Sequence, residues 1–291
     1  MVRVSLGADP EFGFFVERNT KFVQNLKSNE DLCTDEVLDE IIRHQCHSYG
    51  TDGCECVGEI RPRYSINANT LNSNILRCLR GCYNHGGVKE AKGFGFNGGS
   101  LSKGLGELGS EPFSIGGHIH FGVPHTEKLM ARLMLPSVFM LFLESSPNNI
   151  ERRDNCGYGT LQDYRDQDHG FEYRVPCSWL TEPRLSLGVL SLYHSVVRAS
   201  EEHCIPNLYA RLVNSLCRDY RWSDLVDKHS NNDKRFWVKF LPDIIDVIKR
   251  LPDYRKNSGG YRDNIDYLFS MYSRKCKIGE RTDLFKCWGL R

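Results

Sequence analysis

The chain has 291 residues, of which 40% are hydrophobic and 26% are charged, a composition typical of a soluble globular protein with one large domain or two smaller ones. Its 38 basic and 37 acidic side chains give a net charge of +1, so the charge balance does not favour non-specific binding to nucleic acid or to a membrane surface. No apolar run reaches the roughly 20 residues that cross a bilayer, and the N-terminal "MVRVSLGADPEFGFFVE" carries acidic residues that are not typical of a signal peptide, so we expect a cytoplasmic protein.

Predicted strands and helices alternate along residues 1–205. Alternating apolar and polar residues predict strands, and apolar residues at helical spacing predict helices. The strands are predicted at 2–17, 21–24, 54–64, 114–124 and 170–180. The helices are predicted at 34–46, 65–85, 126–144 and 184–205, with a glycine-rich loop at 93–109. This order indicates an α+β fold whose sheet has helices on one side.

The rest of the chain is predicted to be mainly helical. Its helices are expected at 224–229, 240–251 and 264–275, with Trp222 and Trp237 as core residues. No internal repeat or low-complexity linker separates this region from the one before it. We therefore predict a first domain at 1–205 and a helical C-terminal region at 206–291 that packs on the same domain.

Four predicted strands place ionisable side chains on one face and apolar side chains on the other. Residues two positions apart share a face, because the side chains of a strand alternate. A sheet that packs helices on its apolar face gathers the ionisable groups on the opposite face. They are Asp9 and Glu11, then Glu55, Glu59 and Arg61, then His118 and His120, and finally Glu172 and Arg174.

So many carboxylates on one face would repel one another unless cations neutralised them. Carboxylate oxygens with an occasional imidazole suit magnesium or manganese rather than zinc. The alternative is that each strand is simply solvated on one side. Lysine, the usual residue of a solvated strand face, is almost absent from these faces, and this favours a metal site.

The stretch "FSIGGHIHFGVP" at residues 113–124 places His118 and His120 on one face of a strand, behind two glycines. The histidines could bind a metal, hold a phosphate or pack in the interior. Gly116 and Gly117 add no side chains, so we expect the backbone there to let nucleotide or substrate come close.

Arginines are concentrated between residues 152 and 174, beside two glycines. The guanidinium group binds phosphate oxygens through two parallel hydrogen bonds, so arginines next to a metal site suit phosphate. The alternative is ion pairing with nearby aspartates. The arginines are Arg152, Arg153, Arg165 and Arg174, the glycines are Gly157 and Gly159, and the aspartates are Asp154, Asp163, Asp166 and Asp168.

The glycine-rich loop contains "GFGFNG" and "GLGELG", which both match the pattern G-x-G-x-x-G. Neither follows a strand and opens a helix, as a dinucleotide-binding turn does. Contact with a nucleotide stays open here, and a lid or a plain loop fits the sequence better.

Twelve cysteines are scattered along the chain without paired C-x-x-C motifs. One group could hold a structural zinc ion. The alternative is free thiols in a reducing cytoplasm, where disulfides are rare. The group consists of His44, Cys46, His47, Cys54 and Cys56.

Four motifs in this order resemble the amidoligases of tailed-phage genomes, which are carboxylate–amine ligases of the glutamine synthetase and glutamate–cysteine ligase superfamily. The motifs are "GADPEF", "DGCECVGEIRP", "GGHIHFG" and "RRDNCGYG…YRDQDHGFEYRVPCSWL". The resemblance covers residues 5–182 and implies that 1–205 is the catalytic domain. It implies a curved, mainly antiparallel sheet with helices on one face, like the glutamine synthetase catalytic domain. The open face would bind ATP and Mg²⁺ or Mn²⁺, in the host cytoplasm if the protein is phage-encoded.

The resemblance also assigns roles. ATP would phosphorylate a carboxylate, and an amine would attack the acyl phosphate to leave an amide, ADP and phosphate. The implied metal ligands are Glu11, Glu59, His118 and Glu172, with Glu55 as a further candidate. The implied phosphate-binding and catalytic residues are His120, Arg174, Arg152, Arg153 and Arg165. Asp9 or Glu55 could accept the proton of the amine.

Three other functions stay open on the sequence. A kinase related to the guanidino kinases would keep the phosphate chemistry. A non-catalytic phage structural or host-interaction protein could keep the scaffold alone. A zinc-stabilised binding module would use the cysteine and histidine group. The sequence names neither the acid nor the amine, which could be small molecules or peptides, and it does not indicate the oligomeric state.

Overall fold

The computed structural model describes ten segments of the chain. They are residues 3–15, 49–52, 54–84, 94–96, 115–144, 158–161, 163–219, 240–276, 278 and 284–291. The predicted strand at 21–24, the predicted helices at 34–46 and 224–229, Trp222 and Trp237 lie outside these segments.

The strands of the described segments form one antiparallel sheet of seven strands. They are β1 (Leu6–Phe15), β2 (Tyr49–Asp52), β3 (Cys54–Ile60), β4 (Phe94–Phe96), β5 (Gly117–Phe121), β6 (Tyr164–Gln167) and β7 (Gly170–Tyr173). Their order is β2-β3-β1-β5-β7-β6, and β4 pairs with the end of β1. The α+β fold predicted from the sequence is confirmed.

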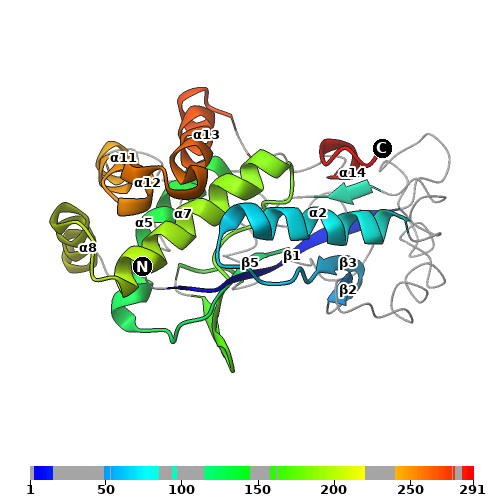
Figure 1. Ribbon diagram of the computed structural model, residues 1–291, viewed down its shortest axis with the longest axis horizontal. Helices are drawn as coiled ribbons and strands as arrows, with labels where there is room; N and C mark the ends of the chain where they lie inside the picture. The colour runs from blue at the N-terminus through cyan, green and yellow to red at the C-terminus, as the bar shows by residue number, and fades with distance from the viewer. Residues whose placement is uncertain are drawn as a thin grey trace.

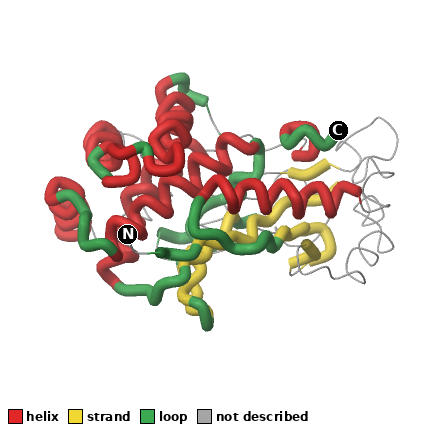
Figure 2. Tube along the Cα trace, in the orientation of Figure 1, coloured by secondary structure: helices red, strands yellow, loops and turns green. Residues whose placement is uncertain are grey.

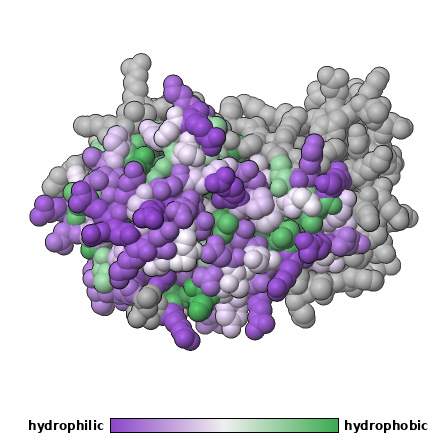
Figure 3. All heavy atoms as spheres, turned by 45° about the horizontal axis from the view of Figure 1, so that its top comes forward, coloured by the Kyte–Doolittle hydropathy of each residue, from purple (hydrophilic) through white to green (hydrophobic). Residues whose placement is uncertain are grey.

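Helices cover one face of this sheet (Figure 1). They are α2 (Ala68–Asn84), α5 (Glu127–Glu144), α7 (Pro183–Glu201), α8 (Asn207–Asp219), α11 (Leu241–Lys249), α12 (Pro252–Lys256), the short 3₁₀ helix η3 (Ser258–Gly260), α13 (Tyr261–Ser273) and α14 (Leu284–Cys287). In Figure 2 the strands lie on one side of the helices, and the hairpin of β6 and β7 extends away from them. The outer side of the helical layer is mostly hydrophilic, with small scattered apolar patches (Figure 3).

The strand residues that face the helices are the apolar ones of the alternating pattern. Leu6 and Ala8 of β1, Ile119 and Phe121 of β5, and Tyr173 of β7 are all buried in the core. Burial of this apolar face is the main force that holds the helices on the sheet. The opposite face therefore keeps the ionisable residues that alternate with them.

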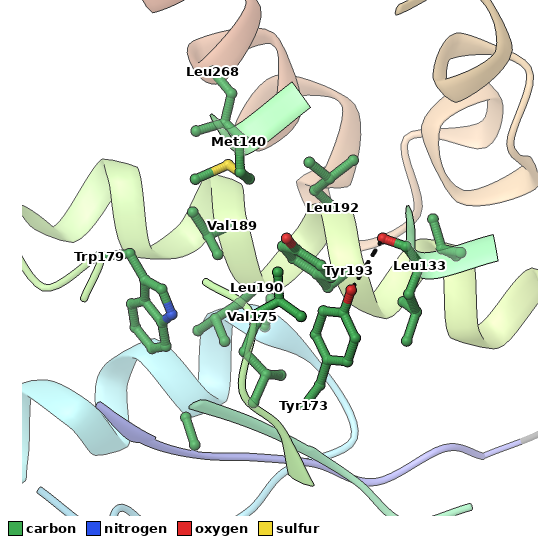
Figure 4. Packing of buried hydrophobic residues seen from close by; sticks show 14 of the residues in the cluster. Leu133, Met140, Tyr173, Val175, Trp179, Val189, Leu190, Leu192, Tyr193 and Leu268 are labelled. Atoms are coloured by element: carbon green, nitrogen blue, oxygen red, sulfur yellow. Dashed lines mark hydrogen bonds between the residues drawn. The ribbon is translucent and has the colours of Figure 1, made fainter. Parts of the chain in front are cut away.

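The contact of β7 with α5 and α7 combines apolar packing with hydrogen bonds between hydroxyl groups. Tyr173 of β7 and Tyr193 of α7 point toward each other and toward Leu133 of α5 (Figure 4). The hydroxyl of Ser137 lies 2.6 Å from that of Tyr173 and 3.2 Å from that of Tyr193. Because these buried hydroxyl groups satisfy one another, the aromatic rings can be buried without the cost of an unpaired polar group.

The C-terminal helices pack on the same core as the sheet. The indole of Trp288 donates a hydrogen bond to the carbonyl oxygen of Leu180, 2.6 Å away. A side chain at Gly188 of α7 would place its Cβ 2.7 Å from Leu268 of α13, so this glycine allows α7 and α13 to approach closely. The domain boundary at residue 205 stays a prediction.

Three strands were not predicted. β2 and β6 are only four residues long, and β4 has three residues inside the predicted glycine-rich loop. Each pairs with a neighbouring strand through backbone hydrogen bonds, which depend little on its own side chains. β7 ends at Tyr173, well before the predicted residue 180. None of the helices within the described segments is long and apolar enough to span a membrane.

His194 of α7 provides a test of the core. It is fully buried, with Nδ1 2.7 Å from the hydroxyl of Tyr261 and Nε2 3.1 Å from the carbonyl oxygen of Val4. Burial lowers the pKa of His194 to about 3. The unfolded chain binds this proton near pH 6.5, whereas the folded chain does not until about pH 3. Stability is therefore unaffected above pH 6.5 and falls as the pH drops from 6.5 toward 3.

We expect His194→Gln to flatten this dependence. Urea unfolding of both proteins between pH 7 and pH 4 measures it, and the wild type should lose up to roughly 1.4 kcal/mol per pH unit more than the variant. The variant is expected to be less stable at pH 7, so the comparison concerns slopes. Equal slopes would show that His194 titrates normally in the fold.

Candidate active site

The site is built on the open face of the sheet, where paired strand positions place ionisable side chains in rows. His120 of β5 is the register partner of Gly7 in β1 and of Glu172 in β7, and Glu172 is the partner of Arg165 in β6. Two residues further along β1, Asp9 is the register partner of His118 in β5. The alternation predicted from the sequence thus brings these groups together on one face.

Asp9 lies between the two histidines. Its Oδ1 is 2.9 Å from Nε2 of His120 and 3.4 Å from Nδ1 of His118. Burial alone would raise the pKa of Asp9, but the interactions with His118 and His120 lower it well below its usual range. Burial likewise opposes the charged form of His120, yet Asp9 and then Glu172 raise its pKa above the usual value. Asp9 is therefore ionised at neutral pH.

Glu172 is fully buried and is surrounded by cationic and polar groups. Its Oε2 accepts hydrogen bonds from Nε of Arg165 at 2.7 Å and from the amide of Gln167 at 3.0 Å. Its Oε1 is 3.2 Å from Nδ1 of His118 and 3.4 Å from Nε of Arg174. A buried carboxylate needs such partners, because an isolated buried charge is very costly.

Glu11 is also buried, on the other side of His118. Its Oε2 accepts a 2.6 Å hydrogen bond from the backbone N–H of Gly116. Its Oε1 is 3.1 Å from the hydroxyl of Tyr158, and this hydroxyl also contacts Nε2 of His118. Tyr158 therefore connects the carboxylate of Glu11 to the imidazole.

Glu59 of β3 is the register partner of Glu11, and it forms an ion pair with Arg61 at the end of its strand. Glu55 lies in the same strand, four residues earlier. Arg152 and Arg153 lie outside the described residues, as do His44, Cys46 and His47, so the predicted zinc group stays a prediction. Cys54 and Cys56 lie in β3.

The two glycines before His118 have a different role from the predicted one. A Cβ at Gly116 would lie 2.2 Å from Nε2 of His118 and 2.9 Å from the Tyr158 hydroxyl. A Cβ at Gly117 would lie 2.4 Å from the carbonyl oxygen of Cys177 and 2.5 Å from the Trp179 indole. The space that the glycines leave is filled by the protein itself, so they are required for packing around His118 rather than for the approach of a ligand.

Arg174 follows β7 and is half-buried in the site. Its guanidinium lies over the ring of Tyr158, 4.7 Å from the centroid, and 3.8 Å from the carboxylate of Asp163. Burial opposes the charge, but Tyr158 and then Asp163 and Glu172 raise the pKa of Arg174 further. It is a permanent cation next to the carboxylate cluster.

A group that could hold a metal ion consists of Asp9, His120 and Glu172, whose ligand atoms all lie within 4.8 Å of one another. Oδ1 of Asp9 and Oε1 of Glu172 are buried and accept no hydrogen bond of good geometry. Both oxygens lie near Nδ1 of His118, and Oε1 of Glu172 also lies 3.4 Å from Nε of Arg174. A divalent cation fits this set, because carboxylate oxygens and an imidazole nitrogen are its usual ligands.

Beside this group lies a pocket of about 760 Å³, within the usual size range for small-molecule sites. It extends from the segment after β3 across Gly7 to the turn between β6 and β7. The lining residues with ionisable or aromatic side chains are Asp9, Arg61, Arg63, Tyr64, His120 and His169.

Sequence reasoning missed several side chains of the site. Tyr158 was overlooked between two glycines, and Gln167 shares the face of Arg165 two positions away, which the period of a strand could have indicated. Asp163 was considered only as one of several surface ion-pair partners. His169 stacks on His120 with ring centroids 5.4 Å apart, a contact that depends on the β6–β7 turn and has no signal in the sequence.

The sequence matches a protein family over nearly its whole length. Residues 6–290 match the family of phage phiEco32-like COOH.NH2 ligases, type 2. The chain belongs to this family. The match includes the C-terminal hundred residues, in which no motif was recognised, and it confirms the predicted resemblance and the prediction of an ATP-dependent carbon–nitrogen ligase.

A crystal structure similar to this ligase is that of the complex between the prokaryotic ubiquitin-like protein Pup and its ligase PafA. The two chains are 12% identical, the similarity covers 94% of this chain and 67% of the other, and the TM-score is 0.46. The ligase matches none of the curated proteins in sequence.

The contacts of Tyr158 lead to a prediction about stability. Tyr158→Phe keeps the ring under Arg174 but removes the hydroxyl from Glu11 and His118. We expect the free energy of unfolding to fall by about 1–2 kcal/mol, because buried polar groups lose a partner. Tyr164→Phe is a matched control, since its hydroxyl contacts His125, 3.2 Å away and outside the site. Urea unfolding should show a loss of less than about 0.5 kcal/mol for the control. Equal losses in both variants would contradict the role of Tyr158.

Proposed function

We propose that the protein joins a carboxylate to an amine through an acyl phosphate formed with ATP on the open face of the sheet, with Mg²⁺ or Mn²⁺ bound there. The observation that supports this most is the convergence of Asp9, His120 and Glu172 from three strands. Arginines stand beside these residues, as phosphoryl transfer requires.

Asp9, His120 and Glu172 are the residues proposed to hold the first cation. The reason is that Oδ1 of Asp9, Nε2 of His120 and Oε1 of Glu172 are all buried without a good hydrogen bond. Bound there, the cation would supply neutralisation of the charge on the phosphate oxygens. Glu11, Glu59 and His118 lie on the same face and stay the predicted ligands of a further cation.

Arg165 and Arg174 are proposed to bind the phosphoryl group during transfer. Both contact Glu172, so they stand at the edge of the proposed cation site. Arg165 is more than half exposed and can turn from Glu172 toward a phosphate. Arg152 and Arg153 are proposed to share this task.

The proposed chemistry has two steps. An oxygen of the substrate carboxylate attacks the γ-phosphorus of ATP, and ADP leaves. The amine nitrogen then attacks the acyl carbon, the amide forms, and phosphate leaves with the former carboxylate oxygen. The carboxylate is already ionised and needs no base, but the amine must lose a proton. Glu55 is the proposed base rather than Asp9, because the lowered pKa of Asp9 makes it a weak acceptor.

Nucleotide binding tests the proposal. Calorimetry should show that the wild type binds ATP only with Mg²⁺ or Mn²⁺, and that Glu172→Gln weakens this binding at least about tenfold. The control is Glu127→Gln, the same change at the exposed start of α5. Circular dichroism establishes that each variant is folded, and Asp9→Asn replaces Glu172→Gln if the latter is not. Absence of metal-dependent ATP binding in the wild type would refute the proposed function.

A further inference from the structure

The pocket beside the proposed cation site contains an arginine, Arg63, that has no role in the proposed ligase chemistry so far. Its outer end is formed by Arg61, Arg63 and Tyr64, which follow β3. Arg61 is paired with Glu59. Arg63 is exposed and its guanidinium contacts no acidic side chain in the described part of the chain.

The backbone that carries Arg63 is firmly held. Leu6 and Ser65 exchange two backbone hydrogen bonds of 2.7 and 2.8 Å. The carbonyl oxygen of Arg63 accepts a 2.8 Å hydrogen bond from the side chain of Asn74 in α2, and the preceding Pro62 is buried. The starting point of the Arg63 side chain is therefore fixed before any ligand binds, which lowers the entropy lost on binding.

The pocket also has an apolar wall. Tyr64 is 66% exposed and lines the pocket together with Arg63 and Gly7. A ligand could lay its carbon chain against the ring of Tyr64 while its charged ends reach Arg63 at one end and Asp9 and His120 at the other. The pocket thus has separate places for a body and for two polar ends.

The nucleotide phosphates are expected elsewhere. Arg165 and Arg174 belong to the β6–β7 side of the row, whereas Arg63 lies on the opposite side of β1, in the segment whose Ser65 pairs with Leu6. The end of the pocket at Arg63 is therefore available to the other substrate of the first step, the acid.

We infer that this pocket binds the acid substrate and that the acid carries a second anionic group, which Arg63 holds while the reacting carboxylate lies at the proposed cation site. The inference rests on the proposed function. It names the substrate class as small diacids, or acidic residues of comparable span.

Straight-chain acids test this assignment. Succinate, glutarate and adipate are compared with butyrate, valerate and hexanoate, which have the same chain lengths and one carboxylate. Binding is measured by calorimetry or ligand-observed NMR in the presence of Mg²⁺ and a nonhydrolysable ATP analogue. We expect the best diacid to bind about tenfold more tightly than its monoacid, since a charge-assisted hydrogen bond accounts for that ratio.

Variants distinguish a specific role of Arg63 from a general effect of positive charge on the protein. Arg63→Gln should abolish the preference for the diacid and leave the affinity for the ATP analogue unchanged, and Arg63→Lys should retain part of the preference. Arg80→Gln, the same change at an exposed position of α2, should behave as the wild type. Arg63 is exposed, so the variants are expected to fold.

Three results would overturn the inference. They are a wild type without preference for any diacid, a preference that survives Arg63→Gln, and a loss of the ATP analogue in Arg63→Gln, which would assign the pocket to the nucleotide. Failure of the wild type to bind the analogue with metal is a separate result, since it refutes the proposed function itself.

Discussion

The structure depends on the burial of several carboxylates on one face of a sheet. Glu11, Glu59 and Glu172 are almost inaccessible, and the side chain of Asp9 on the same face is only 14% exposed. Ionised carboxylates in such a place are costly unless each has cationic or hydrogen-bonding partners. In this site, residues of the neighbouring strands provide these partners.

The partners differ from one carboxylate to another, and this difference distinguishes a structural carboxylate from those that could bind a cation. Glu11 receives a backbone N–H and a tyrosine hydroxyl, groups that are fixed by the fold. Asp9 and Glu172 both contact the imidazole of His118, and each keeps a buried oxygen without a good hydrogen bond. A cation is the group that completes such a set, because it satisfies several oxygens at once. Asp9 and Glu172 keep such an oxygen despite their other partners, so they are good candidates for metal ligands.

The period of the strands predicted this face correctly. Since residues two positions apart must share a face, Asp9 with Glu11 and His118 with His120 could be assigned from the sequence alone. The register between strands could not, because it depends on backbone pairing between residues as far apart in the sequence as Gly7 and His120. The role of His120 as a phosphate contact stays a prediction, and its pairing with Gly7 and Glu172 also brings it into the group that could hold a metal ion.

The glycines before His118 show the same limit on a smaller scale. A glycine in a strand indicates that something comes close, but the sequence does not say what. At Gly117 the neighbours are Cys177 and Trp179, which follow β7 and become adjacent only when β5 and β7 pair. Tyr158 was missed for a related reason, since its contacts with Glu11 and His118 join three separate segments of the chain.

The strand order also suggests how two substrates can meet. Phosphoryl transfer needs the attacking and leaving oxygens roughly in line on opposite sides of the phosphorus. In the row from Gly7 through His120 to Glu172 and Arg165, the Arg63 end of the pocket lies beyond Gly7, and the arginines of β6 and β7 lie at the other end of the row. An acid in the pocket and a nucleotide beside the arginines would approach the proposed cation site from opposite ends. A single row of strand positions is then sufficient to impose the direction of attack.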